Sequence, residues 1–393
     1  MSKKDRLSGN EAVANAIRQI DPDVIAAFPI TPSTEIPQYV SSFKAQGKLT
    51  SEFITVESEH SSISAAAGAE AAGVRAMTAT SSAGFALMHE MLYVVSSDRL
   101  PVVMAVVNRA LSGPININND HSDSMGSRDA GWIQMYSENA QEAYDNMLMA
   151  HRIAEHPDVM LPLMVCQDGF ITSHGVENIV LEDDETVKGF VGEYRPEEHL
   201  LDPERPIGVG PYGVSPYYME MKRGQTEAMC RAEAVIEEVS REFGELTGRE
   251  YGLFEEYCMD DAELGVLCIG SSAGTGKDAV DMLRARGVKA GLVKLRVFRP
   301  FPAAKLASAL KGLKALAIMD KTDSFSAQGG PLGAEVRSAL YQTGVIVPAV
   351  NYVYGLGGRD VRVETFEEIF AELEKIADGA PAEAFRYIGV RER

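Results

Sequence analysis

Two glutamates and a histidine lie close together in the run Val56-Glu57-Ser58-Glu59-His60, which opens a segment rich in alanine and glycine. An acidic residue at the start of a helix is often only a partner of the helix dipole. That explanation accounts for one of these ionisable residues and leaves the other two unexplained. A buried glutamate at this place could instead hold a proton and donate it to a ring nitrogen.

The segment Phe28-Pro29-Ile30-Thr31-Pro32 places a hydroxyl between two prolines, directly after the apolar run of residues 24–27. Proline lacks an N–H and restricts the residue before it to extended geometry, so a strand must stop here. Ligands of open α/β sheets gather outside the carboxyl ends of the strands, which is where Thr31 would lie. The alternative is a plain turn in which Thr31 or Ser33 caps the next helix.

Arg109 follows a second apolar stretch, residues 101–107. A guanidinium at the rim of a sheet can bind a carboxylate through two parallel hydrogen bonds. An internal salt bridge explains the arginine equally well when it is considered alone. The polar stretch of residues 112–132 that comes next is typical of a loop that covers a site.

Small hydroxyl residues and glycine follow one another in Thr78-Ala79-Thr80-Ser81-Ser82-Ala83-Gly84. At a turn from strand to helix, such residues leave backbone N–H groups open to a ligand. A plain cluster of helix-capping residues is an equally good explanation.

Side chains that could bind a metal are present, but their spacing is poor. His89-Glu90 does not belong to an H-E-x-x-H motif, because residue 93 is tyrosine. Asp120, His121 and Asp123 resemble metal ligands, yet no fourth ligand is obvious. We therefore predict no metal site in this chain.

A glycine-rich run, Gly270 to Lys277, imitates a phosphate-binding loop. Its spacing is wrong by one residue, and Asp278 stands where Ser or Thr is required. We predict an ordinary turn and helix start here.

The composition narrows the class of protein. The chain has 393 residues, of which 57 are acidic and 37 basic, and its net charge of −20 argues against nucleic acid and anionic membranes as partners. The four cysteines are far apart and form no C-x-x-C pair, so zinc or iron–sulfur ligation within the chain is not expected. The N-terminus is polar rather than a signal peptide, and no apolar run is long enough for a membrane span. We expect a cytoplasmic protein.

Helical and strand patterns alternate from residue 8 onward. Ser8 and Glu11 have the spacing of a capping box for a helix over residues 9–20. Further helices are predicted over residues 33–45, 59–73, 83–96 and 140–155, and strands over 24–28, 53–56, 75–80, 101–107, 133–137 and 161–166. Short apolar strands separated by helices indicate a mostly parallel sheet covered on both faces.

The second half of the chain is organised differently. Residues 176–221 are acidic and then rich in proline and glycine, which predicts a long irregular excursion before a charged helix over residues 222–248. From residue 262 a second alternating pattern predicts a smaller α/β domain of four strands, over residues 264–270, 289–298, 315–320 and 348–356. We therefore expect one domain over residues 1–250, which includes the excursion, and another over residues 260–393.

The order of these motifs is recognisable. After the segments already described come Cys166-Gln167-Asp168-Gly169-Phe170, then Arg296-Val297-Phe298-Arg299-Pro300, then Gly355-Leu356-Gly357-Gly358-Arg359-Asp360. Over nearly its whole length the chain resembles the alpha subunit of the 2-oxoacid:ferredoxin oxidoreductases, and the pyruvate enzyme is the closest type.

The resemblance implies an α/β fold with a thiamine-diphosphate-binding-type parallel sheet, the pyrimidine-binding domain, followed by a smaller transketolase C-terminal-like domain. It implies that thiamine diphosphate is shared with a beta subunit that carries the diphosphate and Mg²⁺ site. The [4Fe-4S] clusters are implied to lie on partner subunits, among them ferredoxin-like gamma and delta subunits. The resemblance further implies that ferredoxin accepts the electrons, that coenzyme A is a co-substrate and that the assembly is a dimer of heteromers.

The resemblance also assigns residues. Glu59 matches the catalytic glutamate that bonds the pyrimidine nitrogen, and Thr31 and Arg109 match residues that hold the 2-oxo acid. Pro29, Ile30, Glu59 and Ser82 are expected to contact the cofactor. Asn118 stands where pyruvate-type relatives often have tryptophan.

The function implied is oxidative decarboxylation of pyruvate with coenzyme A to acetyl-CoA and CO₂, which is reversible. Within the family, the alternative substrate is a branched-chain or aryl 2-oxo acid. Outside it, the alternatives are a non-catalytic docking subunit and a self-contained thiamine enzyme of transketolase type. The last is disfavoured, because the sequence lacks a G-D-G motif followed by an N-N pair at the spacing that binds diphosphate.

Overall fold

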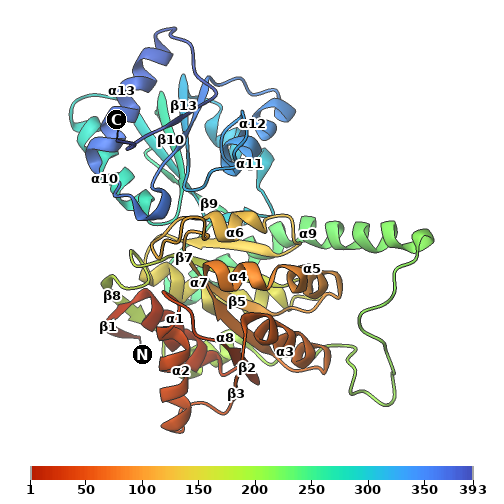
Figure 1. Ribbon diagram of the computed structural model, residues 1–393. Helices are drawn as coiled ribbons and strands as arrows, with labels where there is room; N and C mark the ends of the chain where they lie inside the picture. Colours follow the sequence, from red (N-terminus) through yellow and green to blue (C-terminus); the bar gives the residue numbers. More distant parts are fainter. Residues whose placement is uncertain (1, 392–393) are drawn as a thin grey trace.

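The computed structural model describes residues 2–391 as two α/β domains that pack against each other, the second above the first in Figure 1. The large sheet has the strand order β12-β6-β7-β5-β4-β2-β3, and all its pairings are parallel except that of β12 with β6. Its strands are β2 (Val24–Ala27), β3 (Glu52–Thr55), β4 (Ala76–Thr80), β5 (Val103–Asn108), β6 (Ile133–Ser137), β7 (Leu163–Asp168) and β12 (Val297–Arg299).

Helices cover both faces of this sheet, as predicted. Alternate residues of β5 face two different hydrophobic clusters, Val103 and Ala105 on one face and Met104 and Val106 on the other. This explains why the whole strand is apolar. On the first face lie α1 (Gly9–Ile20), α7 (Ala140–Ala154), α8 (Asp184–Val191) and α9 (Ser215–Thr247), while α2 (Glu35–Ala45) packs on α1. On the second lie α3 (Glu59–Ala71), α4 (Ser82–Leu87) and α5 (His89–Ser97).

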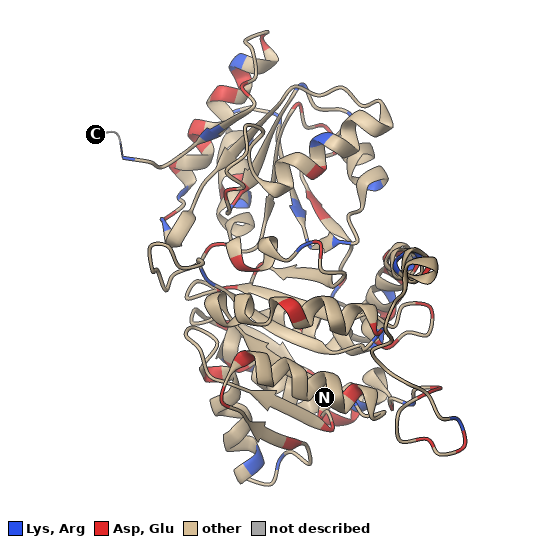
Figure 2. Cartoon of the chain, turned by 45° about the vertical axis from the view of Figure 1, so that its right-hand side comes forward, with Lys and Arg blue, Asp and Glu red and all other residues tan. Residues whose placement is uncertain are grey.

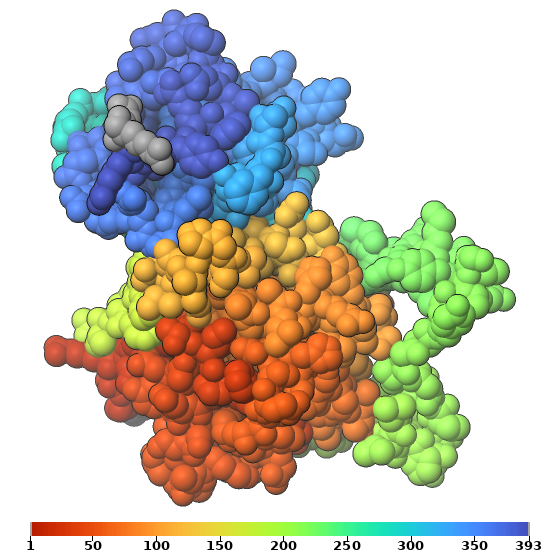
Figure 3. Space-filling view, viewed as in Figure 1, coloured from red at the N-terminus to blue at the C-terminus, as the bar shows by residue number. Residues whose placement is uncertain are grey.

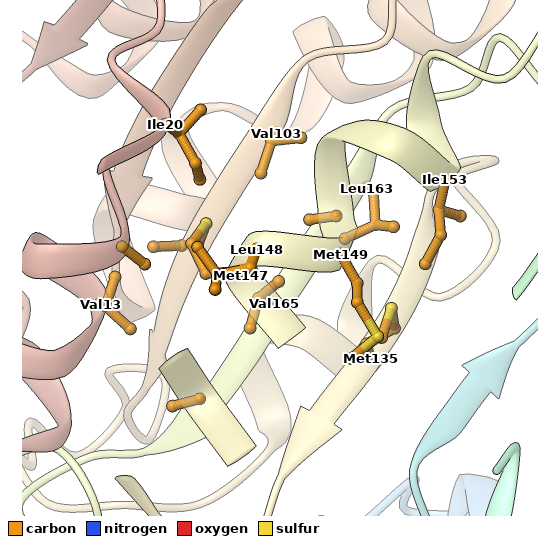
Figure 4. Packing of buried hydrophobic residues seen from close by; sticks show 14 of the residues in the cluster. Val13, Ile20, Val103, Met135, Met147, Leu148, Met149, Ile153, Leu163 and Val165 are labelled. Atoms are coloured by element: carbon orange, nitrogen blue, oxygen red, sulfur yellow. The ribbon is translucent and has the colours of Figure 1, made fainter. Parts of the chain in front are cut away.

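Figure 4 shows the first of these clusters at close range. Val13 and Ile20 of α1 and Met147 of α7 meet the sheet residues Val103 and Val165. Each of these side chains is at most 6% exposed, so the two helices are fixed on the sheet by apolar burial. The predicted capping box of α1 is confirmed, since Glu11 donates its N–H to Ser8 Oγ and Ser8 donates its N–H to Glu11 Oε2.

Two predictions about this domain were wrong. The helix expected over residues 83–96 is two helices, because the chain tightens at Met88, where the N–H is shared between the carbonyls of Gly84 and Phe85. The excursion expected over residues 176–221 is irregular only over residues 192–214. Before it lie α8 and the strand β8 (Val176–Leu181), which pairs with a strand that was not predicted, β1 (Lys3–Ser8).

The charged helix α9 begins at Ser215 rather than at residue 222. The first turn contains a proline. Proline fits there because N–H groups in the first turn of a helix have no partner within the helix, so the helix can begin before residue 222. Its first turns project from the molecule, and Figure 3 shows them with the preceding loop as an arm that stands off the body. Tyr212 and Met219 on this arm are 92% and 78% exposed.

The second domain has a sheet of the order β15-β14-β13-β10-β11-β9, which has two strands more than predicted. The missed strands are β9, which is polar and antiparallel, and the short, half-exposed β15. The elements are β9 (Phe254–Tyr257), β10 (Leu264–Ile269), β11 (Ala290–Leu295), β13 (Ala315–Asp320), β14 (Ala349–Val353) and β15 (Phe385–Tyr387), with α10 (Ser272–Ala285), α11 (Ala303–Leu310), α12 (Pro331–Thr343) and α13 (Val363–Ala377).

The two domains share structure. The apolar run expected as one strand breaks at Arg296, so that β11 stays in the small sheet while β12 pairs with β6 of the large sheet. One hydrophobic cluster runs from Phe85 and Leu92 in the first domain to Leu306 and Leu332 in the second. Acidic and basic residues also lie where the domains meet (Figure 2). No helix among residues 2–391 has both the length and the apolar character that crossing a membrane requires.

Candidate functional site

The carboxyl ends of the strands bring most of the predicted residues to one edge of the large sheet. The loop after β2 lies against the ends of β5 and β7. A Cβ atom on Gly169, which follows β7, would be 2.9 Å from Pro32 Cγ and 2.4 Å from Asn108 O. The start of α3 lies against α4, as described next. The loops after β2, β5 and β7 therefore meet at the carboxyl ends of the strands.

Glu59 is the first residue of α3 and is only 6% exposed. Its carboxylate lies against α4, where a Cβ atom on Gly84 would be 2.4 Å from Glu59 Oε1, so any side chain at residue 84 would displace the Glu59 side chain. Within residues 2–391 the carboxylate has no hydrogen-bond or ion-pair partner. Neither oxygen is sealed from solvent, so the carboxylate faces a space that a bound group could fill and hydrogen-bond.

Arg109 follows β5 and is 7% exposed. Its Nη1 donates to the Thr31 carbonyl oxygen at 2.8 Å, and its Nε donates to the Asn116 carbonyl oxygen at 3.0 Å. No carboxylate in the described part of the chain forms an ion pair with it. The internal salt bridge that the sequence left open is therefore not formed, and the charge is available to an anionic ligand.

The loop after β2 presents Pro29 and Thr31 at the surface, with Ile30 half-buried. Ser33 closes the loop, because its N–H and its Oγ both donate to the Ile30 carbonyl oxygen at 2.8 Å. Neither Thr31 nor Ser33 caps α2, whose N-cap residue is Thr34. The plain capping explanation for Thr31 is therefore wrong.

Ser82 lies at the turn from β4 to α4 with a φ of +46° and is fully buried. Its N–H donates to Asp123 Oδ2 at 3.0 Å, and its Oγ donates to the Ala110 carbonyl oxygen at 2.5 Å. Both donors therefore hold neighbouring loops together, and the contact with a cofactor stays a prediction.

Asp123, in the short helix α6 (Ser122–Gly126), was not expected to organise the site. Its carboxylate accepts hydrogen bonds from the N–H groups of Ser82 and Arg109, at 3.0 and 2.9 Å, and from Asn108 Nδ2 at 2.8 Å. Burial raises the pKa of Asp123 to about 6, although these hydrogen bonds oppose the shift. Asp123 thus fixes the turns after β4 and β5 relative to each other.

The other two residues that resembled metal ligands also have protein partners. Asp120 Oδ1 accepts from the N–H and the Oγ of Ser122, at 3.0 and 2.6 Å. His121 Nε2 lies 2.7 Å from Asp168 Oδ1. Over residues 2–391, no three His, Cys, Asp or Glu side chains are arranged to hold a metal ion.

Asp168, at the end of β7, joins the two domains. It is 1% exposed, and its Oδ2 accepts a hydrogen bond from Lys321 Nζ at 2.6 Å and another from the Ser271 N–H at 3.1 Å. Burial alone would raise the pKa of Asp168, but the charges of Lys321 and His121 hold it well below its usual range. No local pattern predicts the pair of Asp168 and Lys321, because the two residues are far apart in the chain.

A second buried ionic cluster lies nearby at the same junction. Lys294 Nζ is 3.0 Å from both Glu138 Oε2 and Glu142 Oε2, and Lys277 Nζ is 2.9 Å from Glu138 Oε2. Lys277 is the residue that imitated a phosphate-loop lysine. Lys277 lies near the start of α10, and its ammonium group pairs with carboxylates from other elements. The prediction of an ordinary turn and helix start is therefore confirmed.

Models of two known protein families match the chain. The thiamine-diphosphate-binding model of pyruvate flavodoxin/ferredoxin oxidoreductases matches residues 15–241, more than half of the chain. The chain belongs to the pyruvate:ferredoxin oxidoreductase family. The model of core domain II of pyruvate:ferredoxin oxidoreductase matches residues 262–366, so the two matched regions correspond to the two domains of the structure.

Relatives within the pyruvate:ferredoxin oxidoreductase family match over nearly the full length. The chain is 51% identical to pyruvate synthase subunit PorA of Thermotoga maritima and 46% identical to that of Methanocaldococcus jannaschii, each over 98% of both chains. It is 42% identical to ketoisovalerate oxidoreductase subunit VorA of Pyrococcus abyssi, over 95% of this chain and 94% of that subunit.

Solved structures show the same fold. A 2-oxoglutarate:ferredoxin oxidoreductase from Magnetococcus marinus, with 2-oxoglutarate, coenzyme A and succinyl-CoA bound, superimposes with a TM-score of 0.74 at 20% identity. The match covers 95% of this chain, and this chain spans 65% of the length of that one. A split-gene transketolase superimposes with a TM-score of 0.53 at 13% identity, over 95% of this chain and 98% of the other.

Proposed function

We propose that this chain is the alpha subunit of a pyruvate:ferredoxin oxidoreductase, which converts pyruvate and coenzyme A to acetyl-CoA and CO₂ and passes the electrons to ferredoxin. One observation carries the proposal. Glu59 and Arg109 are buried without an opposite charge at the ligand-binding edge of a sheet, in a chain of this family. A chain that only docks on a partner has no use for two such residues.

The residues present suit thiamine diphosphate. The unpartnered Glu59 carboxylate, fixed against Gly84, can share a proton with a nitrogen of the aminopyrimidine ring. Pro29 and Ile30 would line the ring, and Ser82, which is fully buried, would support the cofactor from the turn between β4 and α4. When bound, the cofactor supplies a nucleophilic carbon for addition to the 2-oxo group and accepts the electron pair released with CO₂.

Arg109 and Thr31 would orient the substrate. The Arg109 guanidinium would hold the carboxylate of the 2-oxo acid, and the Thr31 hydroxyl, at the surface of the loop after β2, would bond the substrate beside it. Two contacts fix the direction in which the 2-oxo group faces the cofactor. This orientation is the contribution of these two residues to catalysis.

The rest of the reaction would need partner subunits. Residues 2–391 present no cluster of metal ligands. We assign the diphosphate and Mg²⁺ site to a beta subunit, and the [4Fe-4S] clusters to ferredoxin-like gamma and delta subunits. Coenzyme A would be the acyl acceptor, and the complex would be a dimer of these heteromers.

Branched-chain 2-oxo acids are the second candidate substrates. The relative that supports them is the ketoisovalerate oxidoreductase subunit, at 42% identity. Identity to the pyruvate synthase subunits is 51% at its highest among the relatives compared, which favours pyruvate.

The test is purification of the native complex and assay of coenzyme A-dependent ferredoxin reduction with pyruvate, 2-oxoisovalerate, 2-oxoglutarate and an aryl 2-oxo acid. We expect pyruvate to give the highest kcat/KM. A higher value with 2-oxoisovalerate would move the assignment to the branched-chain enzyme, and no turnover with any 2-oxo acid would refute the proposal. The isolated chain should bind no thiamine diphosphate in calorimetry, because half of the cofactor site is missing.

A further inference from the structure

The loop after Arg109 is fastened to the other domain. A turn of the C-terminal domain that contains a short 3₁₀ helix, η1 (Leu356–Gly358), lies against residues 116–120. The Gly357 N–H donates to Asp120 Oδ2 at 3.2 Å, and the Gly358 N–H donates to the Asn119 carbonyl oxygen at 2.6 Å. The loop beside the candidate site therefore depends on a domain that holds none of the predicted site residues.

Asn116 connects this turn to the arginine. Its Nδ2 donates to the Gly357 carbonyl oxygen at 2.9 Å, and its Oδ1 accepts from the Asn118 N–H at 2.7 Å. Its own carbonyl oxygen accepts from Arg109 Nε at 3.0 Å. One residue thus contacts the C-terminal domain with its side chain and the guanidinium with its backbone.

The glycines of the turn make this close approach possible. Gly357 and Gly358 have φ angles of +60° and +79°, which favour glycine. A Cβ atom on Gly357 would lie 2.4 Å from Asn116 Nδ2, and one on Gly358 would lie 2.4 Å from Asn118 Cβ. Both the backbone conformation and the available space therefore select glycine where the turn meets the loop.

We infer that Asn116 is a positioning residue through which the C-terminal domain sets the orientation of the Arg109 guanidinium, an inference that rests on the proposed role of Arg109 with the substrate carboxylate. The guanidinium is held at two points. One is the Thr31 carbonyl in its own domain, and the other is the Asn116 carbonyl, which the second domain fixes. Hydrogen bonds at two of its nitrogens fix the plane of the guanidinium, so that it can bind a carboxylate in one defined geometry.

The test compares Asn116→Ala, Gly357→Ala and the double variant in the complete enzyme complex. Each single variant should raise the KM for the 2-oxo acid about tenfold, with kcat changed less than about twofold, because binding geometry is lost while the cofactor residues are untouched. The double variant should match the more affected single variant, since both changes break the same link. Asn178→Ala, which removes a hydrogen bond of an exposed asparagine on β8, is the matched control and should leave KM unchanged.

Asn116→Asp keeps the acceptor for the Asn118 N–H, replaces the donor to Gly357 by an oxygen and adds a negative charge, so it should raise the KM at least as much as Asn116→Ala. Its nearly unchanged size guards against a simple folding defect. An unchanged KM in the Asn116 variants, with a raised KM in Arg109→Lys, would overturn this inference and leave the proposed function standing. An unchanged KM in Arg109→Lys as well would refute the role of Arg109 itself. A loss confined to kcat would make Asn116 merely structural and would also overturn the inference.

Discussion

Buried charges at the carboxyl edge of the large sheet differ from those at the domain junction in how they are compensated. At the edge, Glu59 has no partner, and the Arg109 guanidinium has two backbone carbonyls but no carboxylate within residues 2–391. At the junction, Asp168 is paired with Lys321 and His121, and Lys294 is paired with glutamates. Paired charges hold the domains together, and unpaired charges leave a requirement that a ligand can meet.

Arg296 shows that the absence of a carboxylate is not enough to identify a ligand site. It is 1% exposed, and its three nitrogens donate to Gly252 O, Asn146 Oδ1 and Ser240 Oγ at 2.7 Å each. Burial lowers the pKa of Arg296 to about 10. In the described part of the chain, Arg109 Nη2 has no acceptor, and this free donor distinguishes the two arginines.

Lys321→Met should have the largest effect, because it leaves Asp168 buried without its principal counter-charge. We expect the free energy of unfolding to fall by about 3–5 kcal/mol. Urea unfolding followed by the fluorescence of the single tryptophan, Trp132, measures it. Lys305→Met, which breaks two ion pairs of a lysine that is 45% exposed, is the control and should cost about 1 kcal/mol or less. Equal losses in the two variants would remove the distinction between the junction and an ordinary surface pair.

Glu59→Gln should leave the fold intact and reduce the turnover of the complex by about a hundredfold or more, the scale of a lost acid–base function. The assay is coenzyme A-dependent reduction of ferredoxin by pyruvate. Glu57→Gln makes the same change two residues earlier at an exposed position and should retain full activity. Near-normal turnover of the Glu59 variant would show that its lack of a partner has no catalytic meaning.

Arg109→Lys keeps the charge and loses the planar fork. The KM for the 2-oxo acid should rise about tenfold to a hundredfold, the equivalent of one charge-assisted hydrogen bond. Arg99→Lys is a matched control, since the Arg99 Nε also donates to a backbone carbonyl, that of Met160, but at the opposite edge of the sheet. Dissociation of the complex by Arg109→Lys, with KM unchanged in the remaining enzyme, would make the arginine structural.

Glu70 is a third kind of buried acid, and its effect is smallest near pH 4.5 and grows only as the pH rises. Burial raises its pKa well above the usual value, so the folded protein retains a proton that the unfolded chain releases near pH 4.5. Its contribution to stability is complete below that pH and is lost as the pH rises toward the raised pKa. Glu70→Gln should therefore gain stability relative to the wild type with increasing pH, by up to about 1.4 kcal/mol per pH unit. Urea unfolding between pH 4 and pH 8 measures the difference, and a constant difference would mean that Glu70 is charged in the fold.

Local patterns in the sequence were sufficient for most of the fold. The apolar runs of β2, β4, β5 and β7 and the capping box of α1 depend on neighbouring residues, and these predictions are confirmed. The strands β1, β9 and β15 were missed because they are polar or short and are formed by pairing with a distant strand. The break at Arg296 has the same cause, since β12 exists only because β6 offers an edge.

The positions of the candidate site residues could be predicted from the sequence, while their roles stay predictions. Thr31, Glu59 and Arg109 follow apolar strands, and this position alone brings them to one edge of the sheet. Asp123 and Asp168 could not be assigned from the sequence, because their roles depend on hydrogen-bond and ionic partners that only the folded chain brings near. Asn116 has the same property, since its partner Gly357 is 241 residues away.

The antiparallel pairing of β12 with β6 has a consequence for cutting the chain. A fragment that ends at residue 250 would keep six strands of the large sheet and lose the strand that covers the edge of β6. Unpaired N–H and C=O groups on an apolar edge are a template for association with other chains. A fragment cut at the boundary between the two domains is therefore not expected to be soluble. The first domain expressed alone should aggregate through β6 unless residues 297–299 are supplied with it.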